Sequence, residues 1–339
     1  MTIDLPISKS IANRLLILQA IHGDELMPVS DSMPDDVQIM SEAIRLLGER
    51  REARIDLGNC GTAMRFLTAY CAQLEGKTTI LDGVERMHHR PIGQLVDALR
   101  SIGADIEYLG EEGFPPLRIK GCVLDTDRIV TIDNPLSTQF VSALLLIGAN
   151  VQTNSTSPYI TLTRETVKNQ EQRTKNHDKL AIEKDWSSAA FWYEYVALYG
   201  VEIELEGLYQ HSLQGDKVVA EIYSQMGVTT KYTANGILIY RSENHNIAPV
   251  LTRDFSACPD LYPAVALTCE RLGIKLQATG VDSLPLKESD RLRAVAEHRT
   301  DADHRMAMAL MIAGYEVDDT ACISKSYPQF LEHFHLLTH

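Results

Sequence analysis

Leu57-Gly58-Asn59-Cys60-Gly61-Thr62-Ala63-Met64-Arg65 opens an apolar run that continues to about Leu74. Two glycines free the backbone, and Asn59 and Thr62 can each cap a helix. Arg65 would lie one turn into that helix, whose first amides point toward whatever lies in front of them. The stretch therefore predicts a helix start that binds an anion. An ordinary capped helix with a solvated arginine would have the same sequence pattern.

Polar caps in front of apolar helices recur along the chain. They stand at Ser8-Lys9-Ser10, Pro135 to Gln139, Asp185 to Ser188, Asp254 to Asp260 and Asp303-His304-Arg305. These starts are about 50 to 80 residues apart, which suits a unit of several strands and two helices repeated six times. The order helix, glycine, strand also recurs, at residues 91–109, 219–228 and 264–274. Both patterns predict an α/β fold.

The composition excludes several classes of function. The 339 residues are 45% hydrophobic and 23% charged, and their net charge is −14, which argues against a nucleic-acid surface. The six cysteines form no C-x-x-C pair and no close Cys/His group, so we expect no metal site. No apolar run is long enough for a membrane span, and the start lacks a basic and apolar leader, so we expect a cytoplasmic protein.

A polar, charge-mixed segment between Thr163 and Lys184 has hardly an apolar anchor and is the best domain boundary in the sequence. Three of the predicted helix caps lie before this segment, and three lie after it. Two similar halves facing each other would make a cleft, and an anion there would need a local cluster of Lys and Arg.

The segment Lys287-Glu288-Ser289-Asp290-Arg291-Leu292 is the densest in chemical groups. On one helical turn, Lys287, Glu288 and Arg291 would place a proton donor or acceptor beside fixed positive charge. The alternative is a plain helix start with a capping acid. Asp301, Asp303 and His304 hint at a metal, but a cap that presents Arg305 explains them better. No nucleotide-binding glycine motif occurs.

Eight motifs, in order and over nearly the whole chain, resemble the signature set of the enolpyruvylshikimate phosphate synthase family. They are 8–14 (Ser-Lys-Ser-Ile-Ala-Asn-Arg), 58–65, 86–92 (Arg-Met-His-His-Arg-Pro-Ile), 137–140 (Ser-Thr-Gln-Phe), 213–216 (Leu-Gln-Gly-Asp), 287–292, 303–308 (Asp-His-Arg-Met-Ala-Met) and 325–328 (Lys-Ser-Tyr-Pro).

The resemblance implies a transferase that moves the enolpyruvyl group of phosphoenolpyruvate to the 5-hydroxyl of shikimate 3-phosphate and releases phosphate, in chorismate and aromatic amino acid biosynthesis. It implies no metal and no organic cofactor, no nucleic-acid or membrane partner, and a monomer. The implied enolpyruvyl transferase fold has six β/α repeats, three in each of two domains, with the active site in the interdomain cleft. We expect residues 11–184 to form the shikimate phosphate side, and residues 1–10 plus 185–339 the phosphoenolpyruvate side.

The family's site residues carry over position by position. Ser137, Thr138 and Thr156 would hold the shikimate phosphate, while Ser10, Arg14 and Tyr159 would hold its carboxylate. Asp260 would accept the proton of the attacking hydroxyl, and Glu288, with Lys287 as its rival, would protonate the methylene carbon. The residues expected to hold phosphoenolpyruvate are Lys9, Gly61, Arg90, Gln139, Arg291, Arg305 and Lys325, and Asn59 and Ser283 complete the expected substrate contacts.

Departures from the family pattern include Ile7, Phe66, Thr138 and Ser283. The chain is also shorter than usual, with losses at the N-terminus, between Tyr159 and Asp185, and between Ala296 and Asp303. Two alternatives remain. One is an enolpyruvyl transferase acting on a UDP-amino sugar, whose usual loop cysteine has no counterpart near Arg90. The other is a non-catalytic ligand-binding relative, which would be expected to have lost Asp260, Lys287 and Glu288.

Overall fold

The chain divides into two compact units in a computed structural model that describes residues 1–176, 182–242 and 247–338. Unit 1 comprises Met1–Lys9, Asp31–Asp35 and Ala181–His339, and unit 2 comprises Ser10–Ser30 and Asp36–Leu180. Within the described residues, no helix combines the length and apolar character needed to cross a membrane.

Unit 2 alternates helices and strands. Its elements are α1 (Lys9–His22), α2 (Asp35–Glu49), β2 (Glu52–Asp56), α3 (Gly61–Ala72), β3 (Thr78–Asp82), α4 (Gly93–Ser101), β4 (Asp105–Tyr108), β5 (Leu117–Lys120), β6 (Val130–Thr131), α5 (Thr138–Leu146), β7 (Val151–Gln152) and α6 (Pro158–Asn176). α1 and α2 each begin with residues that belong to unit 1.

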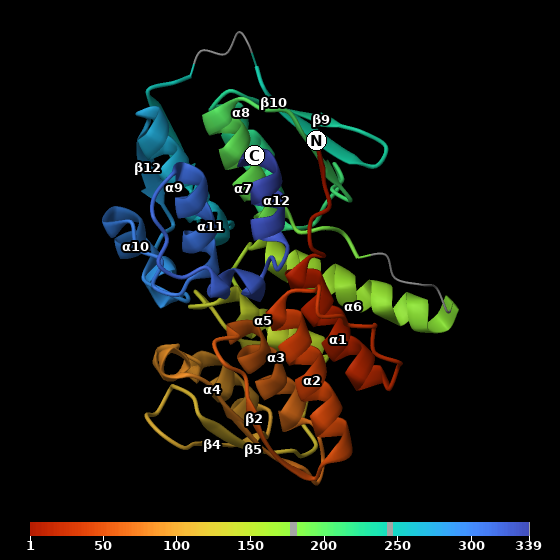
Figure 1. Cartoon of the computed structure of the whole chain (residues 1–339). Coiled ribbons are helices and arrows are strands. Elements are labelled where there is room, and N and C mark those ends of the chain that lie inside the picture. The colour runs from red at the N-terminus through yellow and green to blue at the C-terminus, as the bar shows by residue number, and fades with distance from the viewer. Residues whose placement is uncertain (177–181, 243–246, 339) are drawn as a thin grey trace. The chain divides into compact units, whose positions relative to one another are not determined.

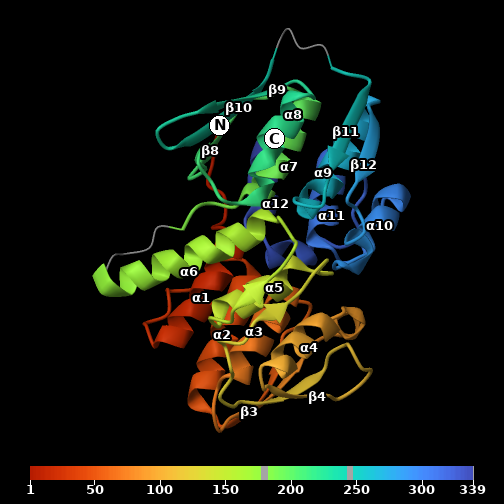
Figure 2. The same cartoon turned by 180° about the vertical axis from the view of Figure 1, so that it is seen from behind.

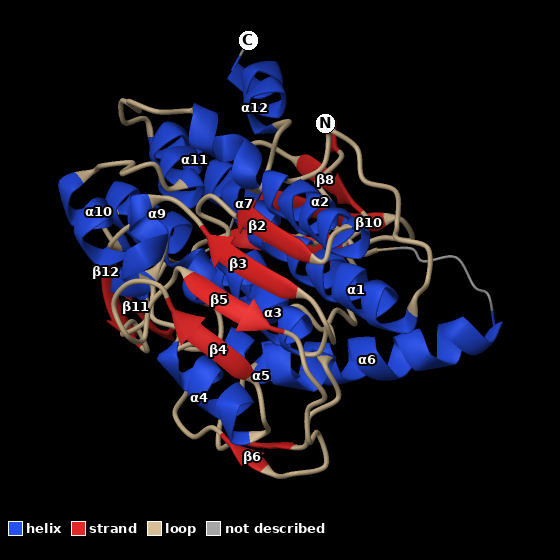
Figure 3. Cartoon of the chain, turned by 90° about the horizontal axis from the view of Figure 1, so that it is seen from below, coloured by secondary structure: helices blue, strands red, loops and turns tan. Residues whose placement is uncertain are grey.

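The sheet of unit 2 has the order β2-β3-β5-β4, and Figure 3 shows these four strands side by side. β2 and β3 are parallel with α3 between them in the chain, whereas β4 and β5 form an antiparallel pair. Alternate residues of β3 and β5 are buried, as expected for a sheet that packs one face on helices. β6 and β7 form a second, parallel pair with α5 between them.

Unit 1 repeats this arrangement. Its elements are β1 (Thr2–Ile3), α7 (Trp186–Tyr199), β8 (Ile203–Glu206), α8 (Val219–Ser224), β9 (Val228–Tyr232), β10 (Gly236–Arg241), β11 (Val250–Asp254), α9 (Tyr262–Leu272), β12 (Lys275–Thr279), α10 (Arg291–Glu297), α11 (His304–Ala313) and α12 (Phe330–Thr338). The sheet order is β1-β8-β10-β9, and β11 and β12 form a parallel pair with α9 between them (Figure 2).

The two four-stranded sheets therefore have one topology: a parallel pair followed by an antiparallel hairpin. In unit 1 the first strand of that pattern is β1, which pairs with β8 some two hundred positions further along the chain. The α/β prediction is confirmed, and every predicted cap is followed by a helix: α1, α3, α5, α7, α9 and α11. The number of six repeats stays a prediction.

Central helices explain the core of unit 1. α7, α9 and α11 pack against one another (Figure 1), and α7 is buried on all sides from Trp186 to Ala197. A helix that is apolar all round is stable only when it is enclosed. Glu194 is an acidic residue within this helix, and it is fully buried as well.

Three local features differ from what the sequence indicated. The polar segment after Thr163 is helical as far as Asn176, because α6 runs through it, and Thr163, Thr166 and Gln170 are buried although the sequence offers hardly an apolar anchor there. Lys287 and Glu288 do not share a helical turn with Arg291, because Asp290 caps α10 and Lys287 is extended. The side-chain cap of α3 is Cys60, whose sulfur accepts the amide of Ala63, rather than Asn59 or Thr62.

Glu194 generates a prediction about pH. Neither carboxyl oxygen of Glu194 has a hydrogen-bond partner among the described residues, and burial raises the pKa of Glu194 well above the ordinary value. Above about pH 4.5 the unfolded chain ionises at this residue while the native state does not, so native stability falls as pH rises, by up to ~1.4 kcal/mol per pH unit. Glu194→Gln removes this loss.

We expect the stability advantage of Glu194→Gln over the wild type to grow between about pH 5 and about pH 8. The measurement is urea unfolding followed by tryptophan fluorescence, which reports on unit 1 because both tryptophans lie in α7. The exposed Glu202→Gln is the matched control. Parallel pH profiles for Glu194→Gln and the wild type would contradict the assignment.

Candidate active site

Asp260 lies at the centre of a charge cluster in unit 1. It belongs to the short 3-10 helix Pro259–Leu261 that leads into α9. Its Oδ1 is 2.7 Å from Nη1 of Arg291 and 3.3 Å from Nζ of Lys287, and its Oδ2 is 3.0 Å from Nη2 of Arg305. Burial by itself would raise the pKa of Asp260, yet Arg305, Lys287 and Arg291 together hold that pKa well below its usual range.

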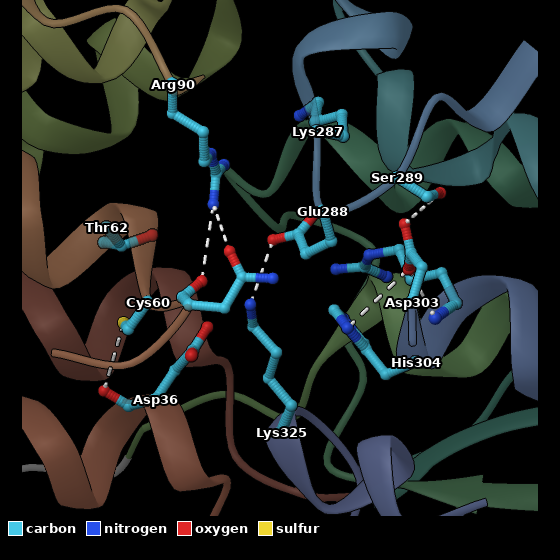
Figure 4. A network of polar contacts seen from close by, with 12 residues as sticks. Asp36, Cys60, Thr62, Arg90, Lys287, Glu288, Ser289, Asp303, His304 and Lys325 are labelled. Atoms are coloured by element: carbon cyan, nitrogen blue, oxygen red, sulfur yellow. Dashed lines mark hydrogen bonds and ion pairs between the residues drawn. The ribbon is translucent and has the colours of Figure 1, made fainter. Parts of the chain in front are cut away.

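Glu288 bridges two cations of the same unit. One carboxylate oxygen is 3.0 Å from Nη2 of Arg291 and the other is 3.2 Å from Nζ of Lys325, a contact that Figure 4 shows. Lys325 ends the 3-10 helix Ala321–Lys325. Only 11% of the Glu288 side chain is exposed, so this carboxylate is held in one place between fixed positive charges.

Asp303 is the hub that orders these helix starts. It caps α11 by accepting the amide of Arg305 at 2.9 Å, and it also pairs with Nε of Arg291 at 2.7 Å. The hydroxyl of Ser289 donates to it as well (Figure 4). The sequence predicted the cap. It gave no sign of the ion pair, which joins residues twelve positions apart.

Asp216 also belongs to the charge cluster. The sequence analysis identified the motif 213–216 that contains Asp216 but gave this residue no role in the site. It is fully buried and accepts the hydroxyl of Ser187. Burial, together with the negative charge of Asp260, raises the pKa of Asp216 to about 6 against the opposing effect of Arg305. Its carboxylate therefore belongs to the same electrostatic environment as Asp260.

Lys9 and Ser283 complete the predicted residues of unit 1. The amide of Lys9 donates to Asp185 at 3.2 Å, and Asp185 also caps α7. Lys9 is close enough to His304 to help burial lower the pKa of that imidazole well below its ordinary value. Ser283 begins the 3-10 helix Leu284–Leu286, just before Lys287.

In unit 2, Arg14 is buried among protein oxygens. Its Nε donates to Thr163 at 2.7 Å, and its Nη1 donates to the carbonyl of Ser10 at 2.7 Å. Its Nη2 reaches Ser142 and the carbonyl of Tyr159. In this state Arg14 orders Ser10 and Tyr159, the residues predicted to share a substrate carboxylate with it.

The starts of α3 and α5 are joined by polar contacts. Arg65 donates to the amide oxygen of Gln139 at 2.6 Å, and the amide nitrogen of Gln139 donates to Thr62 at 2.9 Å. Ser137 caps α5 by accepting the amide of Gln139, and Thr138 is the first residue of that helix. Thr156 lies in the segment before α6, and its side chain is exposed.

Arg90 lies directly against the backbone at the start of α3. Its Nη1 is 3.3 Å from the carbonyl oxygen of Asn59, and a methyl group at Gly61 would be 2.6 Å from Cζ of Arg90. Only glycine at position 61 lets the guanidinium approach this closely. The predicted anion site therefore combines helix-start amides with a fixed positive charge.

These groups can serve acid and base chemistry on an anion. In unit 1 the structure gathers Asp260, Lys287, Glu288, Arg291, Arg305 and Lys325. In unit 2 it gathers Asn59, Gly61 and Arg90, and separately Ser10, Arg14 and Tyr159. Among the residues that the structure describes, no group of three or more His, Cys, Asp or Glu could hold a metal ion.

Comparison with known proteins identifies one family. The family model for EPSP synthase (3-phosphoshikimate 1-carboxyvinyltransferase) matches residues 48–298 and 295–334. The 3-phosphoshikimate 1-carboxyvinyltransferase of Bacteroides fragilis is 38% identical over 389 aligned positions, covering 97% of this chain and 93% of that protein. The alignment is longer than the 339 residues of this chain, so the relative has internal segments that the chain lacks.

Solved structures share the fold. EPSP synthase from Acinetobacter baumannii has a TM-score of 0.68 at 20% identity, covering 99% of this chain and 95% of that one. The enolpyruvyl transferase NikO from Streptomyces tendae has a TM-score of 0.65 at 12% identity, covering 100% and 94%. At these identities the likeness establishes the fold alone.

Asp303→Asn tests the hub. Asparagine keeps the cap and the volume but removes the charge that faces buried Arg291, and breaking one side of a buried ion pair costs about 3–5 kcal/mol. We expect a loss of ~3 kcal/mol in the unfolding free energy of unit 1, measured by urea titration with tryptophan fluorescence. Asp290→Asn, at the cap of α10, should change it by less than ~0.5 kcal/mol. Equal losses in the two variants would refute the role of Asp303.

Proposed function

The chain belongs to the EPSP synthase (3-phosphoshikimate 1-carboxyvinyltransferase) family, and we propose that its residues carry out the family's reaction as follows. The enzyme is a transferase that joins the enolpyruvyl group of phosphoenolpyruvate to the 5-hydroxyl of shikimate 3-phosphate and releases phosphate. This step leads to chorismate and the aromatic amino acids.

The observation that carries the mechanism is the clustering of cations around Asp260. Within ion-pair distance, the carboxylates Asp260, Glu288 and Asp303 face the cations Lys287, Arg291, Arg305 and Lys325. In a chain of net charge −14, four Lys and Arg side chains gathered at one place fit a site that binds an anion. We assign the carboxylate and phosphate of phosphoenolpyruvate to Lys9, Arg291, Arg305 and Lys325.

Substrate charge would also prepare the base. Beside these cations the pKa of Asp260 lies well below its usual range, which makes its carboxylate a weak proton acceptor. Anions bound to Arg305, Lys287 and Lys325 would offset the cations and raise that pKa. Asp260 can then take the proton of the 5-hydroxyl as its oxygen bonds to the central carbon of phosphoenolpyruvate. Base strength therefore depends on the presence of both substrates.

Glu288 is the proposed acid, with Lys287 as its rival. A proton moves to the methylene carbon as the carbon–oxygen bond forms, which gives a tetrahedral intermediate. Removing a proton from the new methyl group then expels phosphate and restores the double bond. Arg291 and Lys325 hold both oxygens of Glu288 in place, but they also favour its ionised form. Glu288 can therefore carry the proton once bound anions offset these two cations.

For shikimate 3-phosphate we assign the helix start at Ser137 and Thr138, with Thr156, to the phosphate, and Ser10, Arg14 and Tyr159 to the carboxylate. Asn59, Gly61, Arg90 and Gln139 would contribute further contacts to phosphoenolpyruvate, and Ser283 would contact the shikimate ring. Because these residues belong to unit 2 except for Ser283, we propose that the substrates bind in a cleft between two domains of three repeats each, 11–184 and 1–10 plus 185–339.

We further propose that the enzyme acts as a monomer in the cytoplasm, without a nucleic-acid or membrane partner. Phosphorylated substrates are the support for this location, since charged metabolites do not cross a bilayer unaided. The negative net charge supports the absence of nucleic-acid binding.

The decisive experiment supplies both substrates to the purified chain. We expect phosphate release and an enolpyruvyl product by mass spectrometry only when phosphoenolpyruvate and shikimate 3-phosphate are both present, at a rate that a chelator does not change. Turnover with a UDP-amino sugar in place of shikimate 3-phosphate would favour the other transferase. Binding without any product would favour the non-catalytic relative.

Asp260→Asn tests the proposed base. The substitution keeps the shape but removes the proton acceptor, so we expect kcat to fall about 10²–10⁴-fold. Shikimate 3-phosphate binding, measured by calorimetry, should change little. Exposed Asp282→Asn serves as the control and should keep full activity. If binding is lost in Asp260→Asn while turnover per bound complex stays high, Asp260 is a binding residue instead.

A further inference from the structure

The connection between α10 and α11, residues 298–303, is where this chain departs from its family. The family model matches this chain in two segments, residues 48–298 and 295–334, which overlap at the end of α10. α10 has seven residues, or about 10 Å of helix, and the connection returns the chain to the start of α11 in six. A short connection of this kind must hold α10 in place by its own contacts.

The backbone of this connection is unusual. His298, Asp301 and Ala302 have φ values of 52°, 47° and 55°, and the described part of the chain has one other non-glycine residue with positive φ, Asn134. L-residues adopt this region at a cost, so neighbouring contacts must compensate. The amide of Arg299 donates to Ala294 at 2.9 Å, and the amide of Asp303 closes a tight turn on Thr300 at 2.9 Å.

Side chains anchor the connection at two points. Thr300 is buried, and its hydroxyl donates to Asp318. The ring of His298 stacks on Tyr315, with centroids 3.9 Å apart and planes 19° apart. Its Nε2 lies 2.9 Å from the carboxylate of Glu270, which also accepts the hydroxyl of Tyr315. His298, Glu270 and Tyr315 thus form a closed triangle of contacts, here called the latch.

The latch ties together the far ends of three helices. His298 ends α10, Glu270 lies in the last turn of α9, and Tyr315 follows the end of α11. The opposite ends of the same helices carry the charge cluster. Asp260 precedes α9, Arg291 begins α10, and Asp303 caps α11. A shift of α10 along its neighbours would therefore move Arg291 relative to both aspartates.

We propose that His298, Glu270 and Tyr315 are positioning residues that replace, in this chain, the support lost with the shortened connection. The latch fixes α10 against α9 and α11, and this keeps Arg291 between Asp260, Glu288 and Asp303. Its effect on catalysis rests on the function proposed above. Its effect on the placement of α10 does not.

The test uses His298→Asn in the full chain. Asparagine tolerates the left-handed helix end but cannot reach Glu270 or stack on Tyr315. We expect kcat to fall about fivefold and KM for phosphoenolpyruvate to rise, a loss of ~1 kcal/mol or more in transition-state stabilisation. Shikimate 3-phosphate affinity should stay unchanged. Tyr315→Phe, which keeps the stack and loses the hydroxyl, should show a smaller change in the same direction.

The matched control is Arg293→Ala. It removes an exposed pair with Glu297 on the same helix and leaves the latch intact. A second readout needs no activity: hydrogen–deuterium exchange of residues 288–297 should increase in His298→Asn and not in Arg293→Ala. If the wild type proves inactive but exchange still increases, the latch stands and the proposed function fails.

Equal kcat, KM and exchange in His298→Asn and Arg293→Ala would overturn the proposal. So would a fall in activity that merely follows the folded fraction measured by tryptophan fluorescence, because the latch would then be only a stabilising contact. Should His298→Asn not fold, Tyr315→Phe decides alone: increased exchange at residues 288–297 supports the latch, and unchanged exchange overturns it.

Discussion

Arg291 is a buried guanidinium in contact with three carboxylates, and the chemistry of unit 1 depends on this one residue. Burial alone would lower its pKa, but Asp303, Asp260 and Glu288 raise it, so the positive charge is permanent. The same contacts join three segments of the chain: the approach to α9, the start of α10 and the cap of α11. Without Arg291, three negative charges would repel one another in a poorly solvated place.

Much of the fold was readable from the sequence because helix starts are local events. Ser137, Asp185 and Asp303 each cap the helix that follows, and a cap involves residues only two or three positions apart. α6 was missed because its buried contacts include Thr163 and Thr166, polar residues whose sequence looks like a linker. The extended backbone at Lys287 was not predicted, because the sequence analysis placed the helix start at Lys287, whereas Asp290 caps α10.

The sequence motifs identified candidate residues of the site but not the tertiary contacts that these residues make. Gly61 and Arg90 are an example, since the close contact between them explains why a glycine stands there. The contacts of Arg14 with Ser142 and Thr163 were not predictable, because they join residues well over a hundred positions apart. The ion pair of Asp303 with Arg291 was not predicted either, because the helix cap was already a sufficient explanation for an aspartate at this position. Tertiary partners of a charge leave no periodic signal in one sequence.

The pairing of β1 with β8 has a consequence for how the protein is made. The two residues of β1 precede unit 2 in the chain, yet their partner strand β8 emerges only after unit 2 has been translated. Unit 2 consists of two nearby stretches and can begin to fold on the ribosome, whereas unit 1 must wait for its C-terminal half. Throughout that time the edge of the unit 1 sheet and the apolar Ile3 lack their partners. The residues of β1 thus leave the ribosome before unit 2 but reach their native place after it.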